Sequence, residues 1–296
     1  MAMDGGRPMA TSQGRGVLID GRSFAALYEA PRHRAVSPHL TKMGAAQTKL
    51  VKRFREGRLR KAAETGKNNQ ILHQLQFSKV DLNAQDDRGR SALMLAAYHG
   101  KTAIVKTLLE AGADTRVCAK GTGWTALVFA ARYGYVDIVR LLIAHGSNVN
   151  VRDNKGFTPL HHCARYSAAT SAEEQQATAS ALLESGALLE TTDFLDSTTP
   201  LHIASASGNC SVLVVLINNG AMMEARDARG ATPLIIASKH QHEQTVATLV
   251  VAGANLEAHD DTGQTALSYA SGARGNMVVA QTLLEGGADA SRCLDS

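Results

Sequence analysis

The sequence predicts an all-α solenoid of about seven stacked helix-turn-helix units joined by short hairpin loops. One observation is a Ser or Thr followed by Ala or Pro and then Leu, which returns after 34, 33, 41, 33 and 33 residues. The other is a Gly followed by Ala or Ser, which recurs once in each block. A period in this range is typical of solenoids, whose units bury their apolar faces only by stacking on their neighbours. The two series are Ser91, Thr125, Thr158, Thr199, Thr232 and Thr265, and Gly112, Gly146, Gly186, Gly220, Gly253 and Gly287.

Each block contains the signals for two short helices. In the block that begins at Thr158, the Thr side chain suits a helix cap, and Pro159 fits the first helical position because its missing N–H would have no partner there. A Gly then ends this helix in most blocks, and an apolar stretch such as 138–143 predicts the second helix. Gly146 stands where a left-handed residue commonly ends a helix, and residues 153–156 predict a turn.

A degenerate unit precedes the six clear ones. Residues 59–66 match the first-helix segment and residues 71–75 match the second, although the Thr-Pro start is missing. Its exposed side is expected to carry Arg58, Arg60, Lys61 and Lys67. Because terminal units of a solenoid need one polar flank, we predict a basic lead-in and N-terminal capping repeat over residues 46–85, and six repeats over residues 86–296.

The third of these six repeats carries an insertion. Seven more residues separate Thr158 from Gly186 than separate Thr125 from Gly146, and the extra stretch includes the polar segment 168–176. We expect both helices of this repeat to be about one turn longer and to be joined by a longer loop. Insertions in repeat arrays map to loops and often mark a binding face, but a tolerated surface insertion is the alternative.

These residues resemble the ankyrin repeat family, whose pattern is a Gly, then Thr-Pro-Leu-His, a small pair, a Gly, an apolar helix and a Gly-Ala-Asp tail. The resemblance covers residues 57–293 with six recurrences in register. It implies antiparallel helix pairs stacked in a curved array, with hairpin-like loops projecting to one side. It also implies that His161 and His202 make structural hydrogen bonds between units.

Composition and charge agree with a binding scaffold. The chain is 44% hydrophobic and only 4% aromatic, and its formal net charge is +4. Residues 1–57 carry ten Lys and Arg against four Asp and Glu, which leaves the repeats mildly acidic. No apolar run suits a membrane span or a signal peptide, and the four Cys show no paired spacing. We therefore expect a cytoplasmic or nuclear protein, or one found in both compartments.

The N-terminal segment lacks periodicity. Residues 1–45 are rich in Gly, Arg, Ser and Met and are predicted to be a disordered tail. The basic cluster 52–61 suggests nuclear import or nucleic-acid binding, and the solvated flank of the capping helix is the alternative. Nucleic-acid binding is the least supported of these, because no basic stripe continues into the repeats.

No catalytic, cofactor or metal site is expected. His161, His162 and Cys163 suggest metal chemistry, but His161 occupies the structural His position and no second ligand pair has suitable spacing. The Glu173-Glu174 pair has no partner acid or base nearby in the sequence. There is also no phosphate-binding loop and no nucleophile elbow, so we do not expect an enzyme.

The candidate site is a set of positions that the repeat pattern leaves free. They lie in the turn before each first helix and at the end of that helix, and the resemblance implies that they line the concave groove. The free positions of the first three full repeats hold five aromatic residues, including the only Trp. The later equivalents, such as Ala206, Ser207, Ala228 and Ala231, are poorer. A purely structural role in the hairpins is the alternative for Trp124 and Phe157. The predicted partner-binding residues are Arg88, Arg90, Tyr98, His99, Trp124, Arg132, Tyr133, Phe157, Arg165 and Tyr166.

Two classes of function remain at this point. The first is a non-catalytic protein-interaction scaffold or adaptor that binds a partner through the groove and the hairpin loops. The second is a regulatory or targeting subunit of an enzyme complex. Both require a protein partner that the sequence does not identify.

Overall fold

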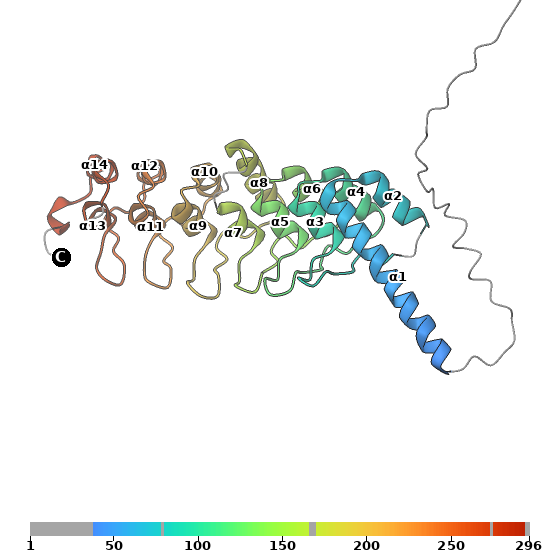
Figure 1. Cartoon of the computed structure of the whole chain (residues 1–296). Coiled ribbons are helices and arrows are strands. Elements are labelled where there is room, and N and C mark those ends of the chain that lie inside the picture. The colour runs from blue at the N-terminus through green and yellow to red at the C-terminus, as the bar shows by residue number, and fades with distance from the viewer. Residues whose placement is uncertain (1–37, 78–79, 166–169, 273–274, 294–296) are drawn as a thin grey trace, which may run out of the picture. The chain divides into compact units, whose positions relative to one another are not determined.

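The computed structural model describes residues 38–77, 80–165, 170–272 and 275–293, and it confirms the prediction of an all-α array of helix pairs (Figure 1). The stacked helices belong to one compact unit, Leu50–Ser296. Within the described ranges there are fourteen α-helices, one 3-10 helix and no strand. The first helix of each pair is α1 (Pro38–Thr65), α3 (Ala92–Tyr98), α5 (Ala126–Arg132), α7 (Pro159–Ala164), α9 (Pro200–Ser207), α11 (Pro233–Lys239) or α13 (Ala266–Ser271). The second is α2 (Asn68–Phe77), α4 (Thr102–Glu110), α6 (Val136–Ala144), α8 (Ala172–Glu184), α10 (Cys210–Asn218), α12 (Glu243–Val251) or α14 (Met277–Glu285), and the 3-10 helix η1 (Ala290–Cys293) follows.

The helices from α3 to α14 form two layers. Each first helix from α3 to α13 packs on the first helix of the next repeat, and each second helix from α4 to α14 packs on the next second helix. One apolar core runs between the layers from Leu59 in α1 to Leu283 in α14. Small side chains in the first helices, such as Ala96 and Ala130, are fully buried and allow this close packing.

The recurring Ser or Thr caps every first helix from α3 onwards. In each case the side-chain oxygen accepts a hydrogen bond from the backbone N–H three residues later. Each such cap stabilises the helix by about 1 kcal/mol. The expected hydrogen bonds between units are also present, since Nε2 of His161 lies 3.1 Å from the Thr198 carbonyl oxygen and that of His202 lies 3.2 Å from the Ala231 oxygen.

Backbone hydrogen bonds connect each hairpin loop to the next. One N–H in each loop from the second to the sixth donates to a carbonyl oxygen in the loop before it. The five bonds run from Lys120 to Arg88 (3.0 Å), Asn154 to Thr122 (3.0 Å), Phe194 to Lys155 (2.9 Å), Ala228 to Asp196 (2.8 Å) and Asp261 to Arg229 (3.0 Å). The loops therefore share one register, and residues at equivalent loop positions lie in rows along the array.

Two features differ from the sequence expectation. Of the two helices, the insertion lengthens only the second, because α8 has 13 residues and α7 has 6, so the expected longer first helix is wrong. The expected longer connection is confirmed, since more residues separate α7 from α8 than separate α5 from α6. The cause is local. Arg165 has an extended backbone that ends α7, and Ser171 begins α8 with a reciprocal capping box to Glu174. At the other end of the chain, α1 begins at Pro38, inside the predicted tail 1–45, of which residues 1–37 lie outside the described residues.

Candidate functional site

A hollow of about 520 Å³ lies between the first two hairpin loops and the helices that follow them. We call it the first groove. Apolar side chains from α3 and α5 form its interior, while charged and polar loop residues form its rim. It is lined by Asp87, Arg88, Arg90, Met94, Leu95, Tyr98, Ala119, Lys120, Gly121, Thr122, Trp124 and Phe129. Four of the predicted partner-binding residues therefore line one hollow, namely Arg88, Arg90, Tyr98 and Trp124.

A continuous row of aromatic rings follows this groove into the third repeat. The Tyr98 ring packs edge-on against Phe129 and Tyr133, with centroids 5.7 and 5.2 Å apart. Trp124 packs in the same way against Phe129 at 5.2 Å and against His162 at 4.6 Å. Such edge-to-face contacts are the preferred geometry of aromatic pairs. The rings therefore support one another, and Tyr98 still keeps 38% of its surface exposed.

Trp124 has a structural role as well as a place in the groove. Its indole N–H donates to Oδ2 of Asp153 at 3.0 Å, and Nε2 of His162 lies 2.9 Å from the same oxygen. The other oxygen of Asp153 accepts the backbone N–H groups of Lys155 and Phe157. Burial opposes ionisation of Asp153, but these hydrogen bonds outweigh it and lower its pKa. Burial lowers the pKa of His162, which therefore favours the neutral imidazole.

The predicted arginines differ in how firmly other groups hold their side chains. Arg90 is held by Asp86, with Nη2 2.9 Å from Oδ2, and Arg132 donates to the backbone oxygen of Arg165 at 3.0 Å. Burial lowers the pKa of Arg132, and the charge of Arg165 adds to this effect. The Arg165 guanidinium lies 5.8 Å from the centre of the Phe157 ring. Arg90 and Arg132 are thus held by protein oxygens, whereas Arg88 and Arg165 are exposed.

The remaining predicted residues lie beside the first groove or outside the described part of the chain. The imidazole of His99 packs edge-on against Tyr98, with ring centres 4.7 Å apart. Burial raises the pKa of Tyr133, and a side-chain hydrogen bond with Tyr98 adds to the shift. Tyr166 lies in the stretch 166–169, which is outside the described residues.

Sequence reasoning missed one position that lines a groove in four of the six repeats. It is the fourth residue after each capping Ser or Thr, and it lies on the first helix, in a segment that was interpreted only as apolar packing. Its residue type changes from repeat to repeat, as Leu95, Phe129, His162, Ile203, Ile236 and Tyr269. This variation was a usable signal, because a position that only packs between helices keeps a similar residue, as Leu93 and Leu127 do two residues after the cap.

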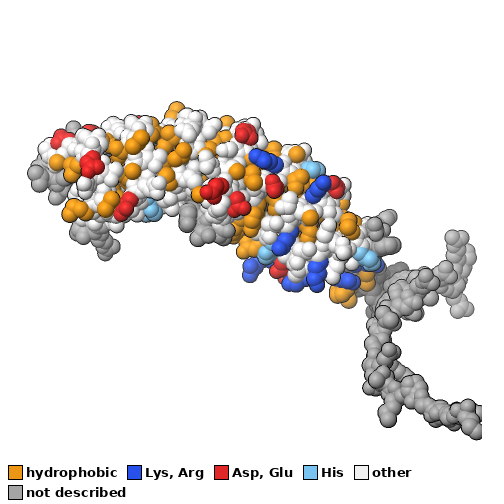
Figure 2. Space-filling model, turned by 90° about the horizontal axis from the view of Figure 1, so that it is seen from above, with side chains coloured by type: hydrophobic (Ala, Val, Ile, Leu, Met, Phe, Trp, Pro, Cys, Tyr) orange, Lys and Arg blue, Asp and Glu red, His pale blue; other side chains and the backbone are white. Residues whose placement is uncertain are grey.

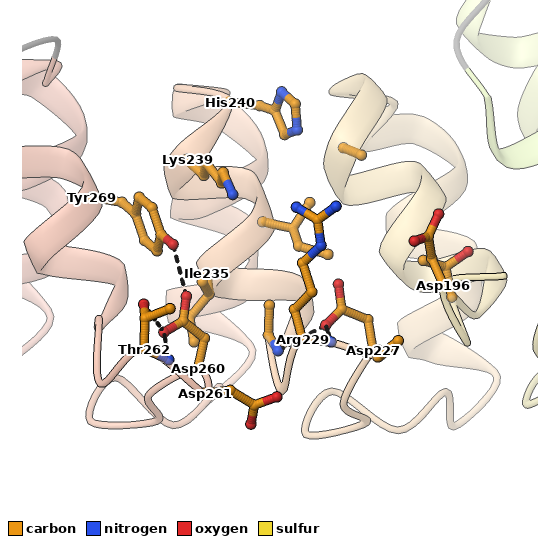
Figure 3. Close-up of a pocket in the computed structure, with 15 residues that line it drawn as sticks. Asp196, Asp227, Arg229, Ile235, Lys239, His240, Asp260, Asp261, Thr262 and Tyr269 are labelled. Atoms are coloured by element: carbon orange, nitrogen blue, oxygen red, sulfur yellow. Dashed lines mark hydrogen bonds between the residues drawn. The ribbon is translucent and has the colours of Figure 1, made fainter.

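A second groove of about 470 Å³ lies between the loops and first helices of the later repeats (Figure 3). Asp227, Arg229, Lys239, Asp260 and Tyr269 are among its lining residues. The Tyr269 hydroxyl donates to Asp260 at 2.7 Å, and the Lys239 ammonium lies 5.2 Å from the centre of the Tyr269 ring. The later repeats therefore offer more charged and aromatic contact residues than the sequence pattern indicated. The small residues at other free positions were considered, but Lys239 and Tyr269 were overlooked.

The described residues contain neither a metal-ligand cluster nor a membrane-spanning helix. In that part of the chain, no group of three or more His, Cys, Asp or Glu is placed to hold a metal ion. None of its helices combines the length and apolar character needed to cross a bilayer. The His161-His162-Cys163 run is buried in the fold. Burial lowers the pKa of His161 to about 4 and raises that of Cys163 to about 12.

Comparison with known proteins identifies the repeat. A family model described as ankyrin repeats (3 copies) matches residues 59–153, 103–193, 146–227 and 201–292. The chain is 42% identical over 77 residues to the Inhibitor of Bruton tyrosine kinase of Xenopus laevis, and 29% identical over 87 residues to the human SMC5-SMC6 complex localization factor protein 1. These segments are 26% and 29% of this chain but only 6% and 8% of those proteins.

Solved structures show the same fold. The human ASB11 ankyrin repeat domain superposes with a TM-score of 0.66 at 23% identity, over 78% of this chain and 98% of that one. The ankyrin repeat domain of Bcl-3 gives 0.62 at 25% identity, over 77% and 97%. A chain of the complex between the predatory endopeptidase Bd0816 of Bdellovibrio bacteriovorus and immunity protein Bd3460 gives 0.56 at 29% identity, over 65% and 96%.

Proposed function

The chain belongs to the ankyrin repeat family, and on this premise we propose that it is a non-catalytic scaffold or adaptor that binds a protein segment in the first groove. Ankyrin repeats generally mediate protein–protein interactions, and the family is typically non-catalytic. The proposal assigns the contact to the loops and first helices of the first three full repeats.

The observation that carries this proposal is the composition of the first groove. Hot spots of protein interfaces are enriched in Trp, Tyr and Arg, and they lie in well-packed pockets. The first groove combines all three residue types around an apolar hollow, and its aromatic rings are held in place by one another and by Asp153. Such a surface needs little ordering on binding, which favours affinity.

A regulatory or targeting subunit of an enzyme complex is the second candidate. It is favoured by the names of two similar proteins, one called an inhibitor of a tyrosine kinase and the other found in a complex of an endopeptidase with an immunity protein. Affinity purification with mass spectrometry separates the candidates. One dominant enzyme partner supports the second candidate, and several unrelated partners support the first.

The same purification tests the site when it is repeated with Tyr98→Ala. Tyr98 is exposed in the groove, so its removal should cost roughly 2 kcal/mol of binding, about thirtyfold in affinity, if it is a hot spot. Lys239→Ala is the matched control, because Lys239 occupies the same position of a later repeat. Thermal unfolding of both variants checks the fold. Partners that survive Tyr98→Ala but are lost with Lys239→Ala would move the site to the second groove.

A further inference from the structure

We infer that the segment bound in the first groove is acidic and inserts one bulky apolar side chain between Tyr98 and Trp124. The inference rests on the proposed function and adds the chemistry of the partner. Two independent features of the groove support it: the charge of the loops that form its rim, and the state of the polar atoms inside it.

The rim charge follows from the register of the loops. The backbone hydrogen bonds between loops define two rows of side chains along the array. One row contains the residue of each loop at the N–H donor position, and the other contains the residue at the C=O acceptor position. In the first three loops these rows contain three cations, Arg88, Lys120 and Lys155, and one acid, Asp87. In the last three loops they contain two acids, Asp196 and Asp261, and one cation, Arg229. The sign of the charge therefore reverses along the array.

The three cations are available to a partner. Arg88, Lys120 and Lys155 are exposed, and none of them makes an ion pair within the described part of the chain. Their backbone atoms, by contrast, are fixed by the bonds between loops and within the turns. A partner with several carboxylates would gain contacts with these side chains without breaking any interaction that holds the loops.

The layer of second helices shows the same change of charge along the array. Figure 2 shows Lys and Arg gathered over the N-terminal half of the visible face and absent from its C-terminal half. The sequences of the helices agree, since α4 and α6 contain Lys106 and Arg140 while α10, α12 and α14 contain no Lys or Arg. The charge distribution as a whole therefore attracts an acidic segment toward the first half of the array.

The interior of the first groove selects an apolar anchor. Its most deeply placed polar group, the Trp124 N–H, is already engaged, because it donates to Asp153. The rest of the interior is formed by Met94, Leu95 and Phe129. A polar side chain that entered among these apolar groups would lose its water for few hydrogen bonds, which is costly. A volume of about 520 Å³ leaves room for one large aromatic or aliphatic side chain.

A library of random peptides displayed on phage, selected on the full chain, tests the inference. We expect the recovered peptides to combine one Trp, Phe or Leu with several Asp and Glu, and their affinity to fall as NaCl is raised. The double variant Arg88→Glu, Lys120→Glu should weaken these peptides at least about tenfold. Arg229→Glu is the matched control, because Arg229 holds the same loop position as Arg88 and lies outside the first groove, so this variant should bind as the wild type does.

The outcomes separate the inference from the proposed function. Peptides that require Tyr98 but lack acidic residues, or that ignore the Arg88 and Lys120 reversal, overturn the inference and leave the first groove as the binding site. A DNA or RNA oligonucleotide that binds with the same dependence on Arg88, in a selection that yields no acidic peptide, also overturns it. A library that yields no binder, or only binders unaffected by Tyr98→Ala, overturns the proposed function itself.

Discussion

Replacement of Trp124 by Phe isolates the hydrogen bond that ties the loop before α5 to the loop before α7. The phenyl ring retains most of the contacts with Phe129 and His162, but the N–H that donates to Asp153 at 3.0 Å is lost. Asp153 is only 5% exposed and keeps three other donors. A hydrogen bond to a charged group contributes about 1.5–3 kcal/mol, so we expect a loss of about 2 kcal/mol in the free energy of unfolding. For a chain of this size that corresponds to a decrease of about 4–8 °C in Tm.

The assay is urea unfolding followed by circular dichroism, since Trp124 is the only Trp and its fluorescence disappears with the substitution. A double-mutant cycle with Asp153→Asn separates the hydrogen bond from the smaller ring volume. We expect a coupling energy of at least about 1 kcal/mol. A coupling below about 0.5 kcal/mol would refute the structural role assigned to the indole N–H, and Trp124 would then contribute to the groove alone.

Two further predictions concern the stability of the array. Gly146 has φ +81, and the space around the position of an added Cβ is open. Gly146→Val should therefore lower the free energy of unfolding by about 1–2 kcal/mol through backbone strain alone, and Gly146→Asn by clearly less. Equal unfolding midpoints for the two variants would contradict this prediction. Burial lowers the pKa of His161 from 6.5 to about 4, so between these values the unfolded chain binds more protons than the folded one. The contribution of neutral His161 to the free energy of unfolding should therefore be fully present above pH 6.5 and decrease by about 3 kcal/mol as the pH falls to about 4. A Tm that stays constant over this window would count against this prediction. So would a His161→Gln variant whose stability depends equally steeply on pH.

The sequence was sufficient to predict the register of the fold because its signals are local and repeated. Thr125 and Thr158 cap the helices that the pattern assigned to them, and Gly146 has the left-handed conformation expected at a helix end. The helix lengths of the third repeat were predicted only in part. The signal for the start of α8 was nevertheless present, since Ser171 and Glu174 have the spacing of a capping box.

The geometry of the site was less accessible from the sequence because it depends on contacts between repeats. Trp124 and Asp153 are 29 residues apart and meet only because the loops stack in one register. The position of Phe129 in the groove depends on which face of α5 is turned toward the loops. One short helix that is apolar on most sides does not reveal this, and only the variation of the equivalent residue across the repeats indicates it. The free loop positions were identifiable because the fold places no demand on their side chains.

The array can change its surface charge from one end to the other because the backbone hydrogen bonds that connect the loops do not involve the side chains that carry the charge. The bonds that connect neighbouring loops use backbone N–H and C=O groups, so they persist whether the acceptor residue is Arg88, Lys155 or Asp196. The caps likewise use one hydroxyl in every repeat. A change of side chain at the loop rows therefore alters what the array attracts while leaving the interactions that hold it together. The aromatic interior of the first groove is different, because Trp124 contributes both to the surface and to the Asp153 hydrogen bonds, and at that position recognition and stability change together.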